Sequence, residues 1–272
     1  MNRPEKMTPF ILKACLRAAQ LSQQSYLSKS FLRTEPAPRF FFSEGDAFGF
    51  LEIAGDSAWL VFRGTVPSSK QQVKADSLAR MNEEWEVGQV HLGFQNELDL
   101  VWEDVLNYVE THAAPQLRRI YVCGHSLGGA MATLAASRLL CHSLKRGDSR
   151  LAPSGLITFG SPRTGDIQFA SFMNALNVGQ DEERGRVGIW RFRNNNDIVT
   201  RVPSYLMGFR HCGKTVYVDH RENIHFDPWL STLILSGFRG AGWRILRDSV
   251  GDHSMVNYLK TLEKHGLEEG LS

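Results

Sequence analysis

Apolar residues recur along the chain with two different periods. Helical spacing, with apolar positions three or four residues apart, predicts helices over residues 10–27, 98–109, 127–140, 167–176 and 255–262. Short runs of β-branched and aromatic residues between turn residues predict strands over 47–53, 58–62, 120–123, 155–159, 189–192 and 215–218. Strands and helices therefore alternate through most of the chain. This order favours a mixed, mostly parallel α/β sheet flanked by helices.

Two segments do not fit this alternation. Residues 66–86 are polar, and they are long for a connection inside a compact sheet. Residues 226–246 form a second apolar stretch near the C-terminal end. No repeat or low-complexity linker divides the chain. We therefore expect a single domain over residues 1–272 that carries both segments.

The composition excludes several classes of protein. Hydrophobic residues make up 42% and charged residues 22% of the 272 residues, so the chain can bury a core and is not disordered as a whole. Lysine and arginine (31) nearly balance aspartate and glutamate (29), which gives no electrostatic basis for binding nucleic acid. Neither an HExxH motif, a Walker sequence nor a GxGxxG motif is present, so we expect no metal or other cofactor.

The sequence contains no recognisable targeting or membrane-spanning segment. A bilayer core requires about 20 consecutive apolar residues, whereas residues 226–246 are interrupted by Asp227, Arg239 and Arg244. The apolar stretch at residues 10–21 contains basic residues and lacks a small-residue cleavage site. We expect a location in the cytoplasm, or export without a cleaved signal. Without an oxidising compartment the four separated cysteines are expected to be reduced thiols.

The sharpest chemical motif is Gly124-His125-Ser126-Leu127-Gly128, which lies between a predicted strand and a predicted helix. A serine on such a tight turn adopts a strained backbone, so the residues two before and two after it must be small. Its Oγ would project from the carboxyl edge of the sheet, towards the positive end of the next helix. The alternative is an ordinary glycine-rich turn with a surface serine. The flanking strand and helix favour a nucleophile.

His125 is not expected to be the base for this serine. Side chains of adjacent residues on a tight turn diverge, so the ring cannot easily reach the Oγ of Ser126. Packing beneath the turn is the expected role of His125.

The chain resembles the fungal-type (class 3) lipase family, which has an α/β-hydrolase fold. The resemblance rests on motifs that occur in the family's order from about residue 60 to residue 260: Phe62-Arg63-Gly64-Thr65, Val90-His91-Leu92-Gly93-Phe94, Val122 to Ala130 around the serine, Thr158-Phe159-Gly160-Ser161-Pro162-Arg163, Asn196 to Pro203, and Asp252 to Tyr258. Several ordered motifs are more specific than any single one.

The resemblance implies a catalytic triad of Ser126 as nucleophile, Asp197 as acid and His253 as base. The order serine, aspartate, histidine is also the one expected of this fold. Thr65 matches the family's oxyanion-hole residue, and Leu127 follows the serine, so its N–H would be the second donor.

Other residues compete for these roles. Asp197 follows a run of asparagines and could simply form a turn, and Asp219 and Asp227 are its rivals as the acid. His220 and His225 lie in a polar loop and are rivals of His253 as the base. We interpret His211 as structural. For Arg163, pairing within its loop is favoured over binding an anionic substrate.

The two irregular segments also have expected roles. In class 3 lipases the position of residues 66–86 holds a lid, and the alternative here is a helix packed on the body of the protein. The segment 226–246 precedes the proposed base, and we expect Trp229, Leu230 and Leu233 to bind substrate in an apolar acyl pocket. A plain core helix is the alternative for that segment.

Together these features predict a serine carboxylic-ester hydrolase of the lipase type. Acylglycerol esters at a lipid–water interface are the expected substrate. A phospholipase or a short-chain esterase is the enzymatic alternative. The non-enzymatic alternative is a lipase-like binding protein that keeps the fold without turnover. A complete triad argues against it, because a scaffold has no physical need for one.

Overall fold

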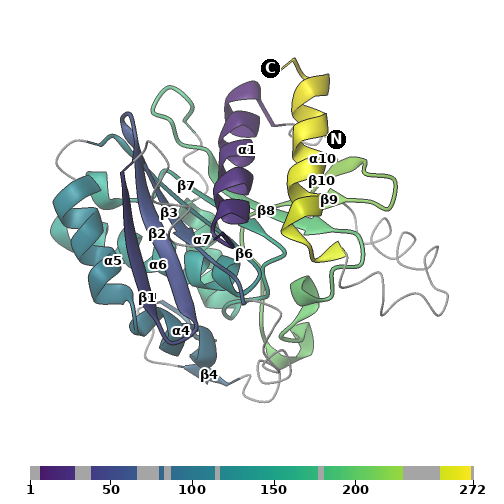
Figure 1. Ribbon diagram of the computed structural model, residues 1–272. Helices are drawn as coiled ribbons and strands as arrows, with labels where there is room; N and C mark the ends of the chain where they lie inside the picture. The colour runs from purple at the N-terminus through teal and green to yellow at the C-terminus, as the bar shows by residue number, and fades with distance from the viewer. Residues whose placement is uncertain are drawn as a thin grey trace.

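The computed structural model describes residues 7–27, 38–65, 80–82, 87–113, 117–176, 181–228 and 252–270. Within them an eight-stranded sheet has the order β1-β2-β3-β6-β7-β8-β9-β10 (Figure 1). Its strands are β1 Arg39–Glu44, β2 Ala47–Ala54, β3 Ser57–Phe62, β6 Arg119–His125, β7 Gly155–Phe159, β8 Gly188–Asn194, β9 Lys214–Val218 and β10 Ile224–Phe226.

The centre of this sheet is parallel and its edges are antiparallel. Strands β3, β6, β7, β8 and β9 pair in parallel, whereas β1, β2 and β3 form an antiparallel meander and β10 pairs antiparallel to β9. The central strands β3 and β7 are buried along their whole length, as expected for strands covered on both faces. The sheet is thus the mixed, mostly parallel sheet predicted from the sequence.

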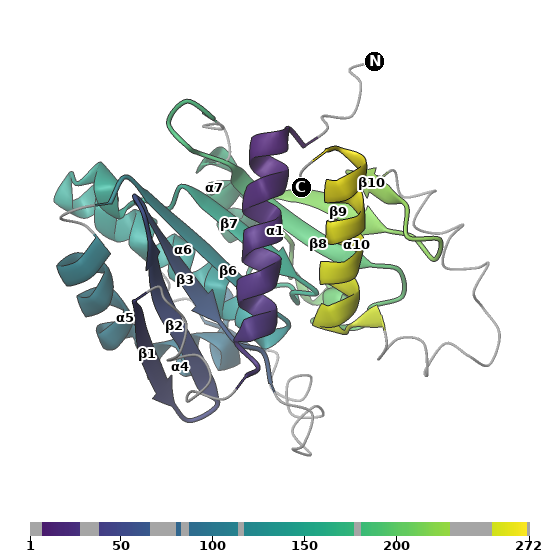
Figure 2. The same cartoon turned by 45° about the horizontal axis from the view of Figure 1, so that its top comes forward.

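Helices cover both faces of the sheet. Helices α1 (Pro9–Gln24) and α10 (Met255–Glu268) lie side by side on one face (Figure 2). The other face is covered by α4 (Leu92–Asp99), α5 (Trp102–Tyr108), α6 (Leu127–Arg146) and α7 (Ile167–Leu176). Alternate strand residues therefore enter two separate cores: Val61 and Cys123 pack towards α1 and α10, and Leu60 and Val122 towards α6.

Local sequence signals explain where several helices begin and end. The hydroxyl of Thr8 accepts a hydrogen bond from the N–H of Ile11, with Pro9 in the first turn of α1. Helix α6 ends at Gly147, whose φ of +65° is the left-handed conformation common after a helix. Asp166 caps α7, since its Oδ1 accepts a hydrogen bond of 2.8 Å from the N–H of Phe169.

The structure differs from the predicted elements in three places. The helix predicted over residues 98–109 is divided: α4 ends at Asp99, α5 begins at Trp102, and a π-helical turn follows at Val109–Ala113. Strands β1 and β10 were not predicted. A small antiparallel pair of β4 (Met81–Asn82) and β5 (Val90–His91) also appears, so the segment 66–86 contains a short strand at Met81.

Membrane-spanning helices and disulfide bonds were both expected to be absent. Among the described residues, no helix is both long and apolar enough to cross a bilayer. The four cysteines Cys15, Cys123, Cys141 and Cys212 are all buried, and none forms a disulfide.

Candidate active site

Ser126 occupies a strained turn between β6 and α6. Its backbone has φ of +59° and ψ of −130°, a region that residues with a side chain rarely adopt. The N–H of Ser126 donates to the carbonyl of Phe159 at the end of β7, at 2.9 Å. Its own carbonyl accepts from the N–H of Gly129 at 2.9 Å. Neighbouring strands thus hold the serine at the carboxyl edge of the parallel strands.

The glycines on either side of the serine have no room for a side chain. A Cβ at Gly124 would lie 2.3 Å from the carbonyl oxygen of Gly128, and a Cβ at Gly128 would lie 2.3 Å from that of Phe62. Both neighbours are backbone atoms and cannot move aside alone. The requirement for small residues two before and two after the serine is therefore confirmed.

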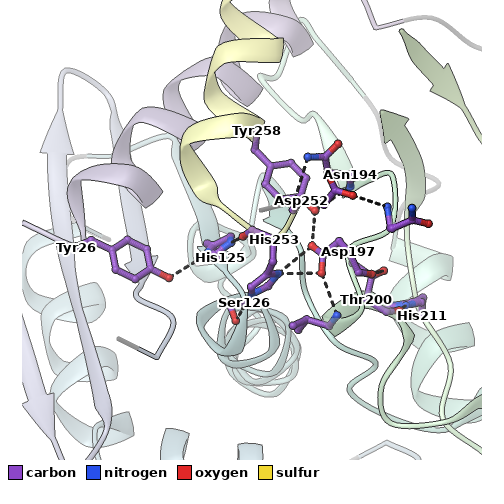
Figure 3. Close-up of polar contacts among 12 residues, drawn as sticks. Tyr26, His125, Ser126, Asn194, Asp197, Thr200, His211, Asp252, His253 and Tyr258 are labelled. Carbon is purple, nitrogen blue, oxygen red and sulfur yellow. Dashed lines mark hydrogen bonds and ion pairs between the residues drawn. The ribbon is translucent and has the colours of Figure 1, made fainter. Parts of the chain in front are cut away.

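Ser126, His253 and Asp197 form one hydrogen-bonded chain (Figure 3). The Oγ of Ser126 lies 2.7 Å from Nε2 of His253. The opposite ring nitrogen, Nδ1, lies 2.9 Å from each carboxylate oxygen of Asp197. Since a carboxylate only accepts, Nδ1 carries the proton and Nε2 can accept one from the serine hydroxyl. These three residues come from loops that are far apart in the sequence.

Asp197 is fully buried, and further donors hold its carboxylate. The hydroxyl of Tyr258, on α10, donates to Oδ2 at 2.6 Å, and the N–H of Val199 donates to Oδ1 at 3.0 Å. Burial and the negative charge of Asp197 raise the pKa of Tyr258 well above its usual value, so the phenol remains a donor. The sequence motif included Tyr258, but sequence reasoning assigned it no contact with the acid.

The turn that carries Asp197 is tied to the residue before the base. Oδ2 of Asp252 accepts from the side-chain amide of Asn195 at 3.1 Å and from the N–H of Asn196 at 3.0 Å. The side-chain amide of Asn194 donates to the carbonyl of Asp252 at 3.0 Å (Figure 3). The asparagine run therefore fixes the relative position of the acid and the imidazole.

His125 lies beneath the turn, as predicted, and bridges two other segments. Its Nδ1 is 2.7 Å from the hydroxyl of Tyr26, and its Nε2 is 2.7 Å from the carbonyl oxygen of His253 (Figure 3). Burial, followed by the nearby His253, lowers the pKa of His125 to about 3. Burial raises the pKa of Tyr26 to about 12. Both groups are therefore uncharged at neutral pH. Sequence reasoning did not single out Tyr26.

Thr65 and Leu127, the two expected oxyanion donors, each lie one residue from a close neighbour of Ser126 or from Ser126 itself. Thr65 follows Gly64, where a Cβ would lie only 2.8 Å from Cβ of Ser126. Leu127 is the first residue of α6, and the first N–H groups of a helix have no acceptor within the helix. Both residues are half-buried. The end of β3 and the start of α6 thus meet beside Ser126.

Three of the rival residues, Asp219, Asp227 and His225, have other partners, and His220 is exposed. Asp219 binds Nε2 of His225 at 2.9 Å, and Asp227 accepts from the N–H of Thr215 at 2.6 Å. His211 is 2.8 Å from the carbonyl of Thr200, and burial and the neighbouring arginines lower its pKa well below the usual value. These contacts are local to the loops around β9 and β10 and to the turn after Asp197.

Arg163 also has a structural role, as favoured from the sequence. Its guanidinium donates to the backbone carbonyls of Arg201 and Pro203, the latter at 2.8 Å. The expected substrate residues Trp229, Leu230 and Leu233 lie outside the described residues, as do most of segments 66–86 and 226–246.

Comparison with known proteins assigns the chain to a family. The model of the family described as "Lipase (class 3)" matches residues 59–207. Phospholipase A1-Igamma2, chloroplastic, of Arabidopsis thaliana is 26% identical over 177 residues, which are 55% of this chain and 32% of that protein. A lipase of Rhizopus oryzae is 31% identical over 160 residues, which are 57% of this chain and 37% of that protein.

The solved structure of lipase II from Rhizopus niveus has the same fold. It superposes with a TM-score of 0.63 at 23% identity, over 78% of this chain and 82% of that chain. The segments matched in the two curated relatives span only about a third of their length. Because the family model matches more than half of the sequence, the chain belongs to the class 3 lipase family.

Proposed function

We propose that the protein is a serine carboxylic-ester hydrolase that cleaves acylglycerol esters through an acyl-enzyme on Ser126. The observation that carries this proposal is the contact of 2.7 Å between Oγ of Ser126 and Nε2 of His253, whose other nitrogen binds the buried Asp197. This arrangement supplies a nucleophile, a base and a group that orients the base.

In the first half-reaction, Oγ of Ser126 attacks the ester carbonyl carbon, and its proton passes to Nε2 of His253. Asp197 stabilises the resulting imidazolium and keeps the ring in the productive tautomer. The backbone N–H of Leu127 and the hydroxyl of Thr65 donate hydrogen bonds to the oxyanion and stabilise it. The loss of one such donor typically costs about 2.7–4 kcal/mol of barrier.

The tetrahedral intermediate then collapses. The bond between the carbonyl carbon and the alcohol oxygen breaks, and the proton on Nε2 of His253 passes to the leaving alcohol. Water next attacks the acyl-enzyme and gives its proton to the same nitrogen. The carboxylic acid leaves, and the proton returns to Oγ of Ser126. Every step uses side chains and backbone groups of this chain.

Hydrolysis of phospholipids is the second candidate. It is favoured by the similarity to a plant protein named phospholipase A1, whereas the Rhizopus relative is named a lipase. Both reactions cleave a carboxylic ester and require the same triad. The two candidates differ in the headgroup that the site accepts.

The test measures hydrolysis of p-nitrophenyl esters of graded chain length by the wild type, Ser126→Ala and Ser149→Ala. Ser149 is exposed at the far end of α6 and serves as the matched control. We expect Ser126→Ala to abolish turnover and Ser149→Ala to retain it. Equal rates for Ser126→Ala and the wild type would disprove the nucleophile. No turnover by the wild type on any ester or lipid would favour a binding protein.

A second assay separates the two substrates. The wild type is incubated with emulsified triacylglycerol and, separately, with phosphatidylcholine vesicles, and the released fatty acid and the remaining lipid are identified. Release from triacylglycerol supports the lipase, and formation of lysophosphatidylcholine supports the phospholipase.

A further inference from the structure

Four large apolar side chains are exposed on the loop that follows β8. Leu206 is 93% exposed, Tyr205 58%, and Ile198 and Met207 50% each. Single exposed apolar residues are common on protein surfaces. Four within one loop form a cluster of the kind that marks an interaction surface. We call Ile198, Tyr205, Leu206 and Met207 the loop patch.

The loop patch is held in a fixed position. The turn η6 (Tyr205–Met207) begins at Ser204, whose Oγ accepts from the N–H of Leu206 at 3.2 Å. Directly after this turn, Phe209 is fully buried, and its ring centre lies 5.6 Å from that of His91. Leu206 is therefore exposed on a turn whose backbone is held by hydrogen bonds and by the buried Phe209.

Arginines lie beside the loop patch. Arg201 is exposed on the turn η5 (Val199–Arg201). The guanidinium carbon of Arg210 lies 3.4 Å from the ring centre of Tyr205. Burial and the positive charges of Arg193, Arg210 and Arg201 lower the pKa of Arg163. The guanidinium of Arg163 also donates to the backbone carbonyls of Arg201 and Pro203, so Arg163 lies against the same loop.

No carboxylate among the described residues forms an ion pair with any of these four arginines. The remaining positive charge favours an anionic partner. Exposed apolar side chains beside Arg201 and Arg210 suit an anionic phospholipid surface, because the apolar side chains enter the acyl region while the guanidinium groups stay among the phosphates.

The loop patch shares an edge of the molecule with the candidate triad. Ile198 directly follows Asp197, and Oγ1 of Thr200 donates to the carbonyl of Asp197 at 2.8 Å. Figure 3 shows Thr200 beside Asp197, with His253 and Ser126 on the other side of that carboxylate. The loop patch thus begins one residue after the carboxylate that contacts His253.

We propose that the loop patch, with Arg201 and Arg210, docks the protein on membranes that contain anionic phospholipid. Docking would present the serine site to lipid in the surface. The biological use of this surface rests on the proposed ester hydrolysis, but its binding to a membrane does not. The two proposals can therefore fail separately.

The experiment measures co-sedimentation with vesicles of phosphatidylcholine alone and of equal parts of phosphatidylcholine and phosphatidylglycerol. The chain carries Ser126→Ala, so that the vesicles are not hydrolysed. We expect binding to the mixed vesicles only, and weaker binding as salt is raised. Leu206→Ser should reduce the partition coefficient about tenfold, and Arg201→Gln about fivefold.

Matched controls are Leu267→Ser, at an exposed leucine near the end of α10, and Arg184→Gln, at an exposed arginine on another loop. Both should bind the mixed vesicles like the parent chain. In the background with Ser126 intact, Leu206→Ser and Arg201→Gln should hydrolyse soluble p-nitrophenyl acetate at the wild-type rate.

Several outcomes would overturn the docking surface. One is equal binding to both kinds of vesicle, and another is unchanged binding by Leu206→Ser. Loss of soluble-ester hydrolysis by Leu206→Ser would show that the loop shapes the site instead. Retention by immobilised polyglutamate without binding to vesicles would indicate an acidic protein as the partner. If the wild type binds mixed vesicles but cleaves no ester, the docking surface stands and the proposed function fails.

Discussion

The backbone carbonyl of His253 accepts a hydrogen bond from Nε2 of His125, over 2.7 Å. Because Nε2 donates and the ring is neutral, Nδ1 must accept, and its partner is the hydroxyl of Tyr26. The hydroxyl of Tyr26 also packs against Gly64, one residue before Thr65, where an added Cβ would lie 2.5 Å from it. A single phenol at the end of α1 thus connects the strand end beside the serine to the backbone of the proposed base.

Replacing Tyr26 with phenylalanine removes this connection and leaves the ring packing in place. We expect kcat on a soluble ester to fall about tenfold with KM nearly unchanged, because the base and the oxyanion donor lose their common support. The matched control is Tyr108→Phe, whose hydroxyl contacts only the carbonyl of Phe41, at 3.4 Å. An unchanged kcat, or a rise in KM alone, would show that Tyr26 does not position the triad.

Asp197→Asn tests the acid while keeping its shape. An amide at this position favours the wrong imidazole tautomer, and in serine proteases the corresponding change lowers kcat about 10⁴-fold. We expect a loss of similar size in steady-state hydrolysis of a soluble ester. Asp219→Asn is the control, because Asp219 binds His225 instead. If Asp219→Asn proved equally damaging, the acid would have to be reassigned.

Tyr258→Phe should have a smaller effect on rate and a measurable effect on stability. The hydroxyl supports Asp197 and also accepts from the buried N–H of Asn194 at 2.9 Å. Its loss leaves that N–H without an acceptor, which costs about 1–3 kcal/mol of unfolding free energy. Urea unfolding measures this loss. If Tyr258→Phe were as stable as the wild type, a water molecule would have to replace the hydroxyl as the acceptor for the N–H of Asn194.

Gly128→Ala should damage the turn that holds Ser126. The added methyl group would meet the backbone of Phe62 at 2.3 Å, and overpacking of this kind costs about 1–3 kcal/mol. Gly266→Ala is the control, because its methyl group would meet the flexible end of Leu16, and alanine favours the helix. Urea unfolding and ester hydrolysis are measured for both. A stable, active Gly128→Ala protein would contradict the close packing.

Acid should destabilise the protein through His125. Its pKa is about 3 in the folded chain, against 6.5 for the free group. Between these values the unfolded chain binds more protons, so the free energy of unfolding falls as the pH drops below about 6.5. The loss is on the order of 2 kcal/mol by pH 5. His125→Gln should show a shallower fall than His220→Gln, an exposed control, in urea unfolding across this pH range. Parallel curves would contradict a buried neutral ring.

The hydrophobic pattern predicted the central strands well because each is a short apolar run between turn residues. It missed β1, whose three consecutive phenylalanines at Phe40 to Phe42 have no alternation, and β10, which is only half-buried. The pattern also predicted one helix over residues 98–109 where the structure has two. The prediction was wrong because the apolar periodicity continues across Leu100 and Val101, although the helical backbone is interrupted there. Apolar periodicity shows which face of a segment is buried, but it does not show whether the helix is continuous.

The members of the triad could be named from the sequence because each is part of a motif with a fixed order. Their supporting residues could not. Tyr26 follows α1, outside the matched family region, and only the packing of α1 against β6 brings its hydroxyl to His125. Likewise, the run of asparagines at residues 194–196 predicts only a turn. The hydrogen bonds from Asn195 and Asn196 to Asp252 join residues that are 57 and 56 positions apart in the sequence, so a local pattern could not predict them.

The residue proposed as nucleophile precedes its base by 127 residues. During synthesis, therefore, Ser126 leaves the ribosome long before the imidazole that would activate it. Until the segment bearing His253 has emerged and helix α10 has packed beside α1, the growing chain lacks the proposed base. Completion of folding and the onset of ester cleavage would then be the same event.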